Sequence, residues 1–140
     1  MTQKILPRGL LMDDNRVFAI HLVRELRRHG FELETYPNAT LALTAFEERT
    51  FDFVVADIIV LADDKPVPDG GLILIHRLRA AERERGSGKD LKVVAISGAI
   101  DKAGMGNLLT TAEGLGADAS LVKPFEVEEL VETLRDLGIG

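Results

Sequence analysis

The stretch FVVADIIV, Phe53 to Val60, decides the fold class of this 140-residue chain. An unbroken apolar run such as Phe53–Ala56 is typical of a parallel strand that is buried on both faces. Asp57 then interrupts the run, although a carboxylate without a partner is costly to bury. The sequence therefore predicts a buried strand with a charged side chain, Asp57, at its carboxyl end.

Strand-like and helix-like patterns alternate along the chain. The short apolar runs that predict strands lie at residues 10–12, 31–36, 53–56, 93–96 and 120–122. The helical patterns, with apolar residues three and four positions apart, lie at 19–26, 39–46, 71–78, 108–115 and 127–137. These five strand–helix units predict an α/β fold: a doubly wound, five-stranded parallel sheet with five helices.

Composition narrows the class of protein. With 46% apolar and 29% charged residues, the chain has the composition of a folded globular protein, and we expect a single domain spanning residues 1–140. The net charge of −6 argues against binding to nucleic acid and against binding to an anionic membrane. The sequence has no cysteine and no apolar run of membrane-spanning length, so we expect a cytoplasmic protein.

Residues that carry chemistry follow four of the five predicted strands. In open α/β sheets the active crevice lies at the carboxyl ends of the strands. The residues expected there are Asp13, Asp14, Asp57, Ser97 and Lys123. Neighbouring carboxylates need a cation among them, and a ligand set made only of oxygen suits Mg²⁺. A metal, an ammonium group and a hydroxyl around one carboxylate would form a phosphoryl-acceptor site.

The same residues carry a resemblance to a known family. The motifs are Met12-Asp13-Asp14, Asp57, Ser97-Gly98, Gly116-Ala117-Asp118 and Lys123-Pro124-Phe125. In this order and spacing they resemble the response-regulator receiver domain of two-component signalling, over essentially the full length of the chain. The resemblance implies a flavodoxin-like receiver fold, and we expect a stand-alone receiver without an output domain.

The resemblance also implies a role for each site residue. Asp57 would be the phosphoacceptor. The groups implied to bind Mg²⁺, with Mn²⁺ as an alternative, are Asp13, Asp14, Asp57 and the backbone carbonyl of Ile59. The residues implied to contact the phosphoryl group and report its presence are Ser97, Gly98 and Lys123. The peptide bond between Lys123 and Pro124 would be cis, which proline permits.

The implied function is transfer of a phosphoryl group from a phosphohistidine to Asp57. The donor would be a sensor histidine kinase or a histidine phosphotransfer protein, and phosphorylation would alter partner binding or feed a phosphorelay. We expect only self-phosphorylation and slow autodephosphorylation, not enzymatic activity in the usual sense. The chain would be a monomer or a weak homodimer, and a downstream partner would bind the face formed by residues 108–115, 120–122 and 127–137.

Three features depart from the family pattern. Ser120 stands three residues before Lys123, where family members usually carry an aromatic ring that takes part in the switch. The segments 58–69 and 98–107 are both longer than usual, and the second is rich in glycine. Because these segments flank the site, we expect them to replace the aromatic ring in reporting phosphorylation.

Simpler structural roles are open for several residues. Asp13 and Asp14 could cap the first helix, since aspartate is a favoured N-cap residue. Solvated positions are expected for the histidines and for the charged residues outside the strand ends, namely His21, His29, His76, Asp63, Asp64, Asp69, Arg77, Arg79 and Arg83 to Arg85.

Three other classes of protein compete with the receiver. A flavodoxin-like cofactor carrier needs an anion-binding loop after the first strand, where Asp13 and Asp14 would repel a phosphate. An aspartyl phosphatase needs its nucleophile there and a second acid two residues later, which an adjacent pair does not provide. A receiver-like scaffold that acts without phosphorylation stays open because of Ser120, although the intact Asp57 and Lys123 argue against it.

Overall fold

The computed structural model describes residues 5–58, 60–62, 65–67, 70–85, 90–98 and 106–140. Its strands are β1 (Arg8–Met12), β2 (Glu32–Tyr36), β3 (Phe53–Asp57), β4 (Val60–Ala62), β5 (Lys65–Val67), β6 (Lys92–Ser97) and β7 (Ala119–Val122). Its helices are α1 (Arg16–Arg28), α2 (Ala39–Glu48), α3 (Gly71–Arg85), α4 (Gly106–Leu115) and α5 (Val127–Asp136). Apart from β4 and β5, strands and helices alternate along the chain, and the predicted α/β class is confirmed.

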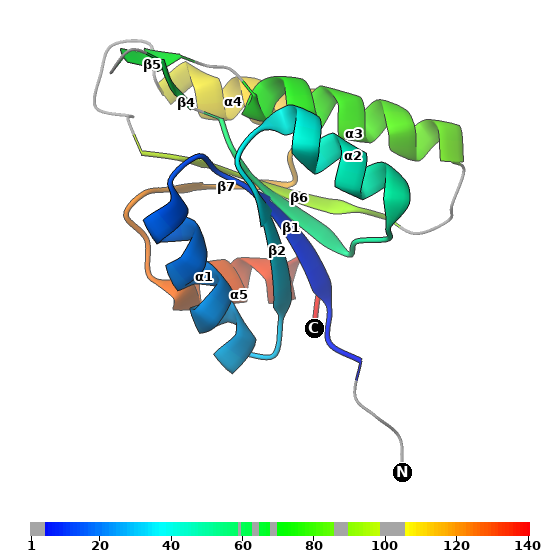
Figure 1. Ribbon diagram of the computed structural model, residues 1–140, viewed down its shortest axis with the longest axis vertical. Coiled ribbons are helices and arrows are strands. Elements are labelled where there is room, and N and C mark those ends of the chain that lie inside the picture. The colour runs from blue at the N-terminus through cyan, green and yellow to red at the C-terminus, as the bar shows by residue number, and fades with distance from the viewer. Residues whose placement is uncertain (1–4, 59, 63–64, 68–69, 86–89, 99–105) are drawn as a thin grey trace.

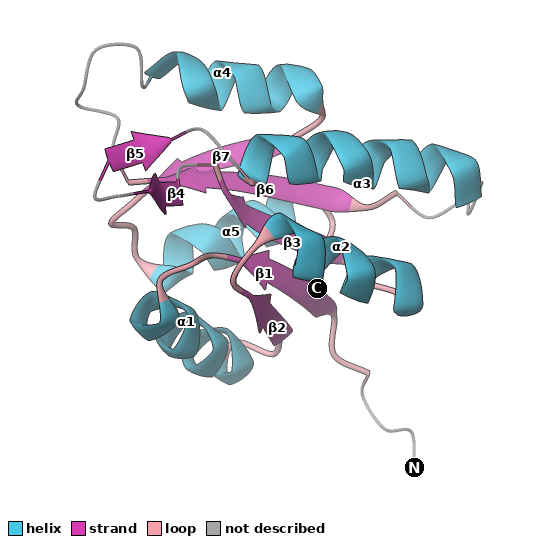
Figure 2. Ribbon diagram, turned by 45° about the horizontal axis from the view of Figure 1, so that its top comes forward, coloured by secondary structure: helices cyan, strands magenta, loops and turns pink. Residues whose placement is uncertain are grey.

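Five parallel strands form the main sheet, in the order β2-β1-β3-β6-β7. Helices α1 and α5 cover one face of this sheet, and α2, α3 and α4 cover the other (Figures 1 and 2). This is the doubly wound arrangement that the alternating pattern predicts. Because all five strands run in the same direction, their carboxyl ends share one edge of the sheet, and the residues that follow them can form one site.

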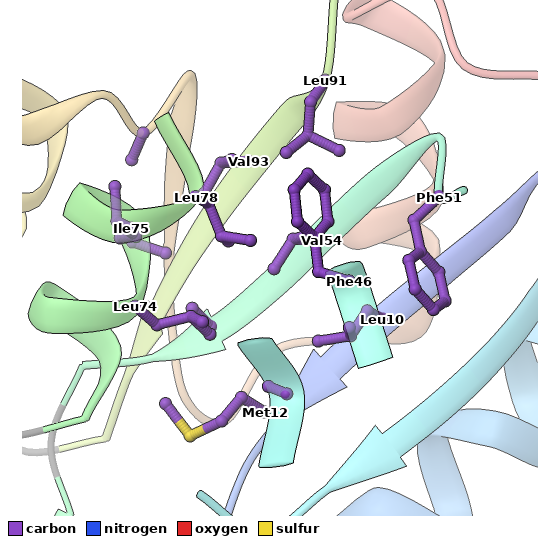
Figure 3. Packing of buried hydrophobic residues seen from close by; sticks show 14 of the residues in the cluster. Leu10, Met12, Phe46, Phe51, Val54, Leu74, Ile75, Leu78, Leu91 and Val93 are labelled. Carbon is purple, nitrogen blue, oxygen red and sulfur yellow. The ribbon is translucent and has the colours of Figure 1, made fainter. Parts of the chain in front are cut away.

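The central strands are apolar throughout because each face of the sheet has its own hydrophobic core. Side chains of successive strand residues point to opposite faces. Along β3, Val54 belongs to the core beneath α2 and α3, whereas Phe53 belongs to the core beneath α1 and α5. Figure 3 shows the first core, in which Leu78 and Phe46 pack near Val54. The apolar run before Asp57 therefore serves both cores at once.

A pair of glycines lets α3 approach the end of β3. Gly70 has a φ of 69°, a left-handed conformation that favours glycine. A Cβ atom on Gly71 would lie 2.2 Å from the backbone carbonyl oxygen of Asp57, so no larger residue fits there without a shift of the backbone. The two glycines thus allow α3 to pack directly against the strand that carries Asp57.

The segment after Asp57 contains an element that the sequence analysis did not predict. Strands β4 and β5 form an antiparallel pair, separate from the main sheet, with Val60 opposite Val67 and Ala62 opposite Lys65. Both ribbon views place this pair near the amino-terminal end of α4 (Figures 1 and 2). We expected only a segment of unusual length over 58–69, whereas two valine-containing runs separated by two acidic residues can pair as a hairpin.

Arg79 corrects the prediction of a fully solvated basic face on α3. Its side chain is 17% exposed and donates hydrogen bonds to the carbonyl oxygens of Gly116, at 2.7 and 2.9 Å, and of Leu91, at 2.7 Å. Its Nη2 atom also lies 2.7 Å from a carboxylate oxygen of Asp118. The helix register explains this, because Arg79 comes four residues after the fully buried Ile75 and shares its face.

Candidate functional site

Four strand ends meet at the carboxyl edge of the main sheet. The residues at these ends are Asp13 directly after β1, Asp57 at the end of β3, Ser97 at the end of β6 and Lys123 directly after β7. Strand β3 lies between β1 and β6, which places Asp57 in the middle. Among the described residues, the buried polar side chains are Asp13, Asp57 and Ser97. The fold therefore gathers its buried polar groups at the edge where the sequence predicted a site.

The ammonium group of Lys123 lies between two of these carboxylates. Its Nζ atom donates a 2.6 Å hydrogen bond to Asp13 Oδ2 and lies 3.4 Å from Asp57 Oδ2. The side chains of Asp13 and Asp57 are 0% and 5% exposed. Carboxylates this far from solvent keep their charge only when a cation or hydrogen-bond donors lie beside them. Lys123 supplies that positive charge.

Asp14 completes an acidic cluster from the solvent side. One carboxylate oxygen from each of Asp13, Asp14 and Asp57 lies within 4.8 Å of the others. Three carboxylates next to one ammonium group leave negative charge that a divalent cation would neutralise. The ligand set consists of oxygen, and the exposure of Asp14 leaves room for water ligands, so the residues present fit Mg²⁺. Ile59, whose carbonyl is an implied ligand, lies outside the described residues.

The first turn of α1 shows that the acidic pair does not cap this helix. Asn15 is the N-cap residue, and its side chain accepts a 3.0 Å hydrogen bond from the backbone N–H of Phe18. Asp13 Oδ1 accepts a 2.9 Å hydrogen bond from the backbone N–H of Asn15, and Oδ2 is used for Lys123. The interpretation of Asp13 and Asp14 as helix caps is therefore wrong, because Asn15 takes that position.

Ser97 and Gly98 lie beside the stem of Lys123. Ser97 is fully buried, and its backbone carbonyl accepts a 2.7 Å hydrogen bond from the backbone N–H of Lys123. A Cβ atom on Gly98 would lie 3.6 Å from two side-chain carbons of Lys123. The peptide bond between Lys123 and Pro124 is cis, as the resemblance implies. These contacts place the end of β6 beside the backbone and the aliphatic stem of Lys123.

A pair of phenylalanines that was not expected at the site lies beside Lys123, and the ring of Phe18 contacts its ammonium group. Lys123 Nζ lies 4.2 Å from the centroid of the Phe18 ring. The rings of Phe18 and Phe125 meet edge to face, with centroids 5.9 Å apart and an interplanar angle of 86°. Phe18 comes four residues before the buried Leu22, so its spacing is that of a core residue and gives no sign of a site. A sequence signal exists for Phe125, which directly follows the Lys-Pro pair.

Comparison with known proteins identifies the family of this chain. The family model described as the response regulator receiver domain matches residues 10–135. The chain belongs to the response regulator receiver domain family. This receiver is 33% identical over 131 residues to the transcriptional regulatory protein PrrA of Mycobacterium tuberculosis, covering 94% of the chain and 49% of that protein. It is 30% identical over 131 residues to the two-component response regulator PhoP of Pseudomonas aeruginosa, covering 91% and 50%. The chain thus spans about half the length of these curated relatives.

Solved structures show the same fold. A CheY-like response regulator receiver domain from Methylobacillus flagellatus superposes with a TM-score of 0.73 at 28% identity, covering 95% of this receiver and 99% of that chain. A putative response regulator from Chloroflexus aurantiacus gives a TM-score of 0.76 at 22% identity, a likeness of fold. The predicted flavodoxin-like receiver fold is confirmed.

Family membership establishes the general function. Receivers are phosphoacceptor modules of two-component signalling, and the family is a signalling module rather than a classical enzyme. The family binds Mg²⁺ at an acidic pocket, and this receiver has an acidic cluster at the corresponding edge. None of the helices in the described part of the chain combines the length and apolar character that crossing a bilayer requires.

The position that departs from the family pattern lies on β7, and its side chain contacts α4. Ser120 is half-buried, and its hydroxyl donates a 3.4 Å hydrogen bond to a carboxylate oxygen of Glu113 on α4. Residues 99–105 and parts of 59–69 lie outside the described residues. The expectation that these two segments replace the aromatic ring of other receivers therefore stays a prediction.

A surface depression of about 320 Å³ borders the acidic cluster through Asp13. Its other lining residues include Arg16, Ile20 and Tyr36. Burial raises the pKa of the Tyr36 phenol, and the hydrogen bond to Glu34 and the charge of that carboxylate raise it further, against the opposing effect of a nearby arginine. Tyr36 is therefore neutral at physiological pH, and its hydroxyl donates to Glu34 and accepts from Arg49.

Proposed function

We propose that Asp57 of this receiver accepts a phosphoryl group from a phosphohistidine. The observation that carries the proposal is the Lys123 ammonium group placed between Asp13 and Asp57 at the carboxyl edge of the sheet. Both oxygens of Asp13 already accept hydrogen bonds, at 2.6 and 2.9 Å, which suits a residue that holds other groups in place. Asp57 ends the central strand and belongs to the acidic cluster, which suits the acceptor.

The transfer is a displacement at phosphorus. A carboxylate oxygen of Asp57 attacks the phosphorus atom, and the bond from phosphorus to the histidine nitrogen breaks. The imidazole leaves with that electron pair and takes up a proton. Asp13, Asp14 and Asp57 would hold Mg²⁺, which would supply positive charge against the transferring phosphoryl oxygens. Lys123 exchanges a carboxylate contact for a phosphoryl oxygen, so its positive charge stays in the site throughout.

Ser97 and Gly98 complete the proposed phosphoryl site. Both lie at the end of β6 beside Lys123, and the Ser97 hydroxyl is a donor that a phosphoryl oxygen could accept from. Slow hydrolysis of the product would restore Asp57, with a water oxygen attacking phosphorus and the carboxylate leaving. We also retain Ile59 as the third protein ligand of Mg²⁺, through its backbone carbonyl.

The partners we propose are a sensor histidine kinase or a histidine phosphotransfer protein as donor, and a protein that binds the face of α4, β7 and α5. Two observations support this face as the downstream surface. Val122 on β7 is 37% exposed although it is a large apolar residue, and Ser120 connects β7 to α4 through Glu113. A scaffold that acts without phosphorylation is not favoured, since the complete acidic cluster and its lysine are assembled.

Incubation with acetyl phosphate and Mg²⁺ tests the proposal. The wild-type protein should gain one phosphoryl group, detected by intact-mass spectrometry, and chelation of Mg²⁺ should prevent the gain. Asp57→Asn should take up none, because a carboxamide is not a nucleophile for phosphorus.

Asp52, which lies just before the start of β3, provides a matched control for Asp57 at the end of the same strand. The Asp52 carboxylate accepts a hydrogen bond from the backbone N–H of Arg8, far from the acidic cluster in the fold. Asp52→Asn should be phosphorylated like the wild type. Uptake that persists in Asp57→Asn would show that a different residue is the acceptor.

A further inference from the structure

The surroundings of Lys123 contain an aromatic face as well as carboxylates. On one side its Nζ atom contacts Asp13 at 2.6 Å and Asp57 at 3.4 Å. On another side the centroid of the Phe18 ring lies 4.2 Å from Nζ, well within the range of a cation–π interaction. The Lys123 side chain is 18% exposed, so little water competes with the ring for the ammonium group.

The Phe18 ring is itself held from two directions. The backbone N–H of Phe18 donates a hydrogen bond to the side chain of Asn15. This bond fixes the first turn of α1, directly after Asp13 and Asp14. The Phe18 ring meets the Phe125 ring at 86°, an edge-to-face arrangement that aromatic pairs prefer. Phe125 comes two residues after Lys123, so the ring and the ammonium group that it contacts are positioned by the same short segment.

We propose that Phe18 is a positioning residue, whose ring face holds the Lys123 ammonium group in the site while its carboxylate partners change. This inference rests on the proposed function, because it concerns the lysine that pairs with the incoming phosphoryl group. Asp13 and Asp57 would loosen their contacts with Lys123 when they hold a metal ion and when Asp57 carries a phosphoryl group. The ring binds neither, so its attraction for the ammonium group persists through the exchange.

An ordinary packing role is the competing explanation for Phe18. The ring is partly buried and packs against the core beneath α1 and α5. A packing role depends on the size and shape of the ring, whereas a cation–π role depends on the electron density of its face. Fluorine atoms on the ring withdraw electron density from its face and change its shape little. Fluorinated phenylalanines therefore distinguish the cation–π role from the packing role without leaving a cavity at position 18.

The experiment replaces Phe18 with phenylalanines that carry one, two or three ring fluorines. The rate of phosphorylation by acetyl phosphate at saturating Mg²⁺ should fall with each added fluorine, by about three- to tenfold over the series. The Mg²⁺ concentration needed for half-maximal rate should not change, because a phenylalanine ring offers no ligand to a magnesium ion. The same series at Phe31, a core residue in an edge-to-face pair with Phe53, is the matched control and should leave the rate unchanged.

A second measurement tests the placement of the ring without any phosphoryl chemistry. In the unphosphorylated protein, the Lys123 Hε protons should resonate upfield because of the Phe18 ring current, and Phe18→Leu should remove that shift. A phosphorylation rate that is flat across the Phe18 series, with the wild type active, overturns this inference and leaves the proposed function intact. A wild-type protein that takes up no phosphoryl group overturns both, whereas an unshifted Lys123 signal overturns the inference alone.

Discussion

Lys123 and Arg79 are two shielded basic side chains whose surroundings differ in kind. Their side chains are 18% and 17% exposed, and both lie within 2.7 Å of a carboxylate oxygen. Lys123 is surrounded by other side chains, namely two carboxylates and an aromatic ring. Arg79 donates instead to the backbone carbonyls of Gly116 and Leu91, besides its contacts with carboxylates.

This difference shows which of the two sets of contacts, the Lys123 network or the Arg79 network, can change partners. A backbone carbonyl moves only with its chain, so Arg79 fixes the turn between α4 and β7 to α3 and to the start of β6. A carboxylate or an ammonium group can rotate to meet a metal ion or a phosphoryl oxygen. Burial and charge pairing are common to both places, and the nature of the partners distinguishes the functional site from the structural contact.

The largest effect is expected for Lys123→Ala, which removes the cation from the site. Phosphoryl uptake from acetyl phosphate should slow by about a hundredfold, as for the loss of one preorganised group that stabilises transition-state charge. The metal-free variant should also be less stable than the wild type in urea unfolding, since Asp13 and Asp57 lose their positive partner. Mg²⁺ should recover part of that stability, because a divalent cation can take the place of the ammonium group.

Arg79→Ala should have the opposite profile, with a loss of stability and no loss of phosphoryl uptake. We expect the free energy of unfolding to fall by about 3 kcal/mol, because two carbonyls and two carboxylates lose their donor. Arg79→Lys should fall between this variant and the wild type, since lysine keeps the charge but not the forked donors. Added Mg²⁺ should stabilise Arg79→Ala no more than it stabilises the wild type.

Asp118→Asn should give the smallest effect, a loss of about 1 kcal/mol in the free energy of unfolding. The amide oxygen can still accept the 2.8 Å hydrogen bond from the backbone N–H of Val93, and what is lost is the charge opposite Arg79. Phosphoryl uptake should match that of the wild type. If Arg79→Ala or Asp118→Asn lost stability and was also phosphorylated slowly, the Arg79 contacts and the Lys123 contacts would be coupled. The Arg79 contacts would then not be purely structural.

Much of the fold could be predicted because the signals are local. The apolar run before Asp57 identifies a buried strand, and the spacing of Leu22 and Leu26 identifies one face of a helix. The carboxyl-end rule then places Asp13, Asp57 and Lys123 at one edge, although 110 positions separate the first from the last. This placement depends only on the order and direction of the strands, and not on individual side-chain contacts. It could therefore be predicted from the sequence.

The parts that were missed depend on partners far away in the sequence. Arg79 belongs to an arginine-rich helix whose composition suggests exposure to solvent, and the two carbonyls that it binds lie 12 and 37 residues later. Phe18 has the spacing of a core residue, and nothing near it in the sequence indicates a lysine above its ring. The β4–β5 hairpin was missed because three-residue strands carry too little pattern to be distinguished from a loop.

Direct localisation of the phosphoryl group is the sharpest test of the central claim that Asp57 is the acceptor. The protein would be phosphorylated by acetyl phosphate with Mg²⁺ and treated with borohydride, which reduces an aspartyl phosphate to homoserine. Peptide mass spectrometry would then locate the homoserine. We expect homoserine at position 57, formed only when Mg²⁺ is present. Homoserine at position 13 or 14 with unmodified Asp57 would contradict it.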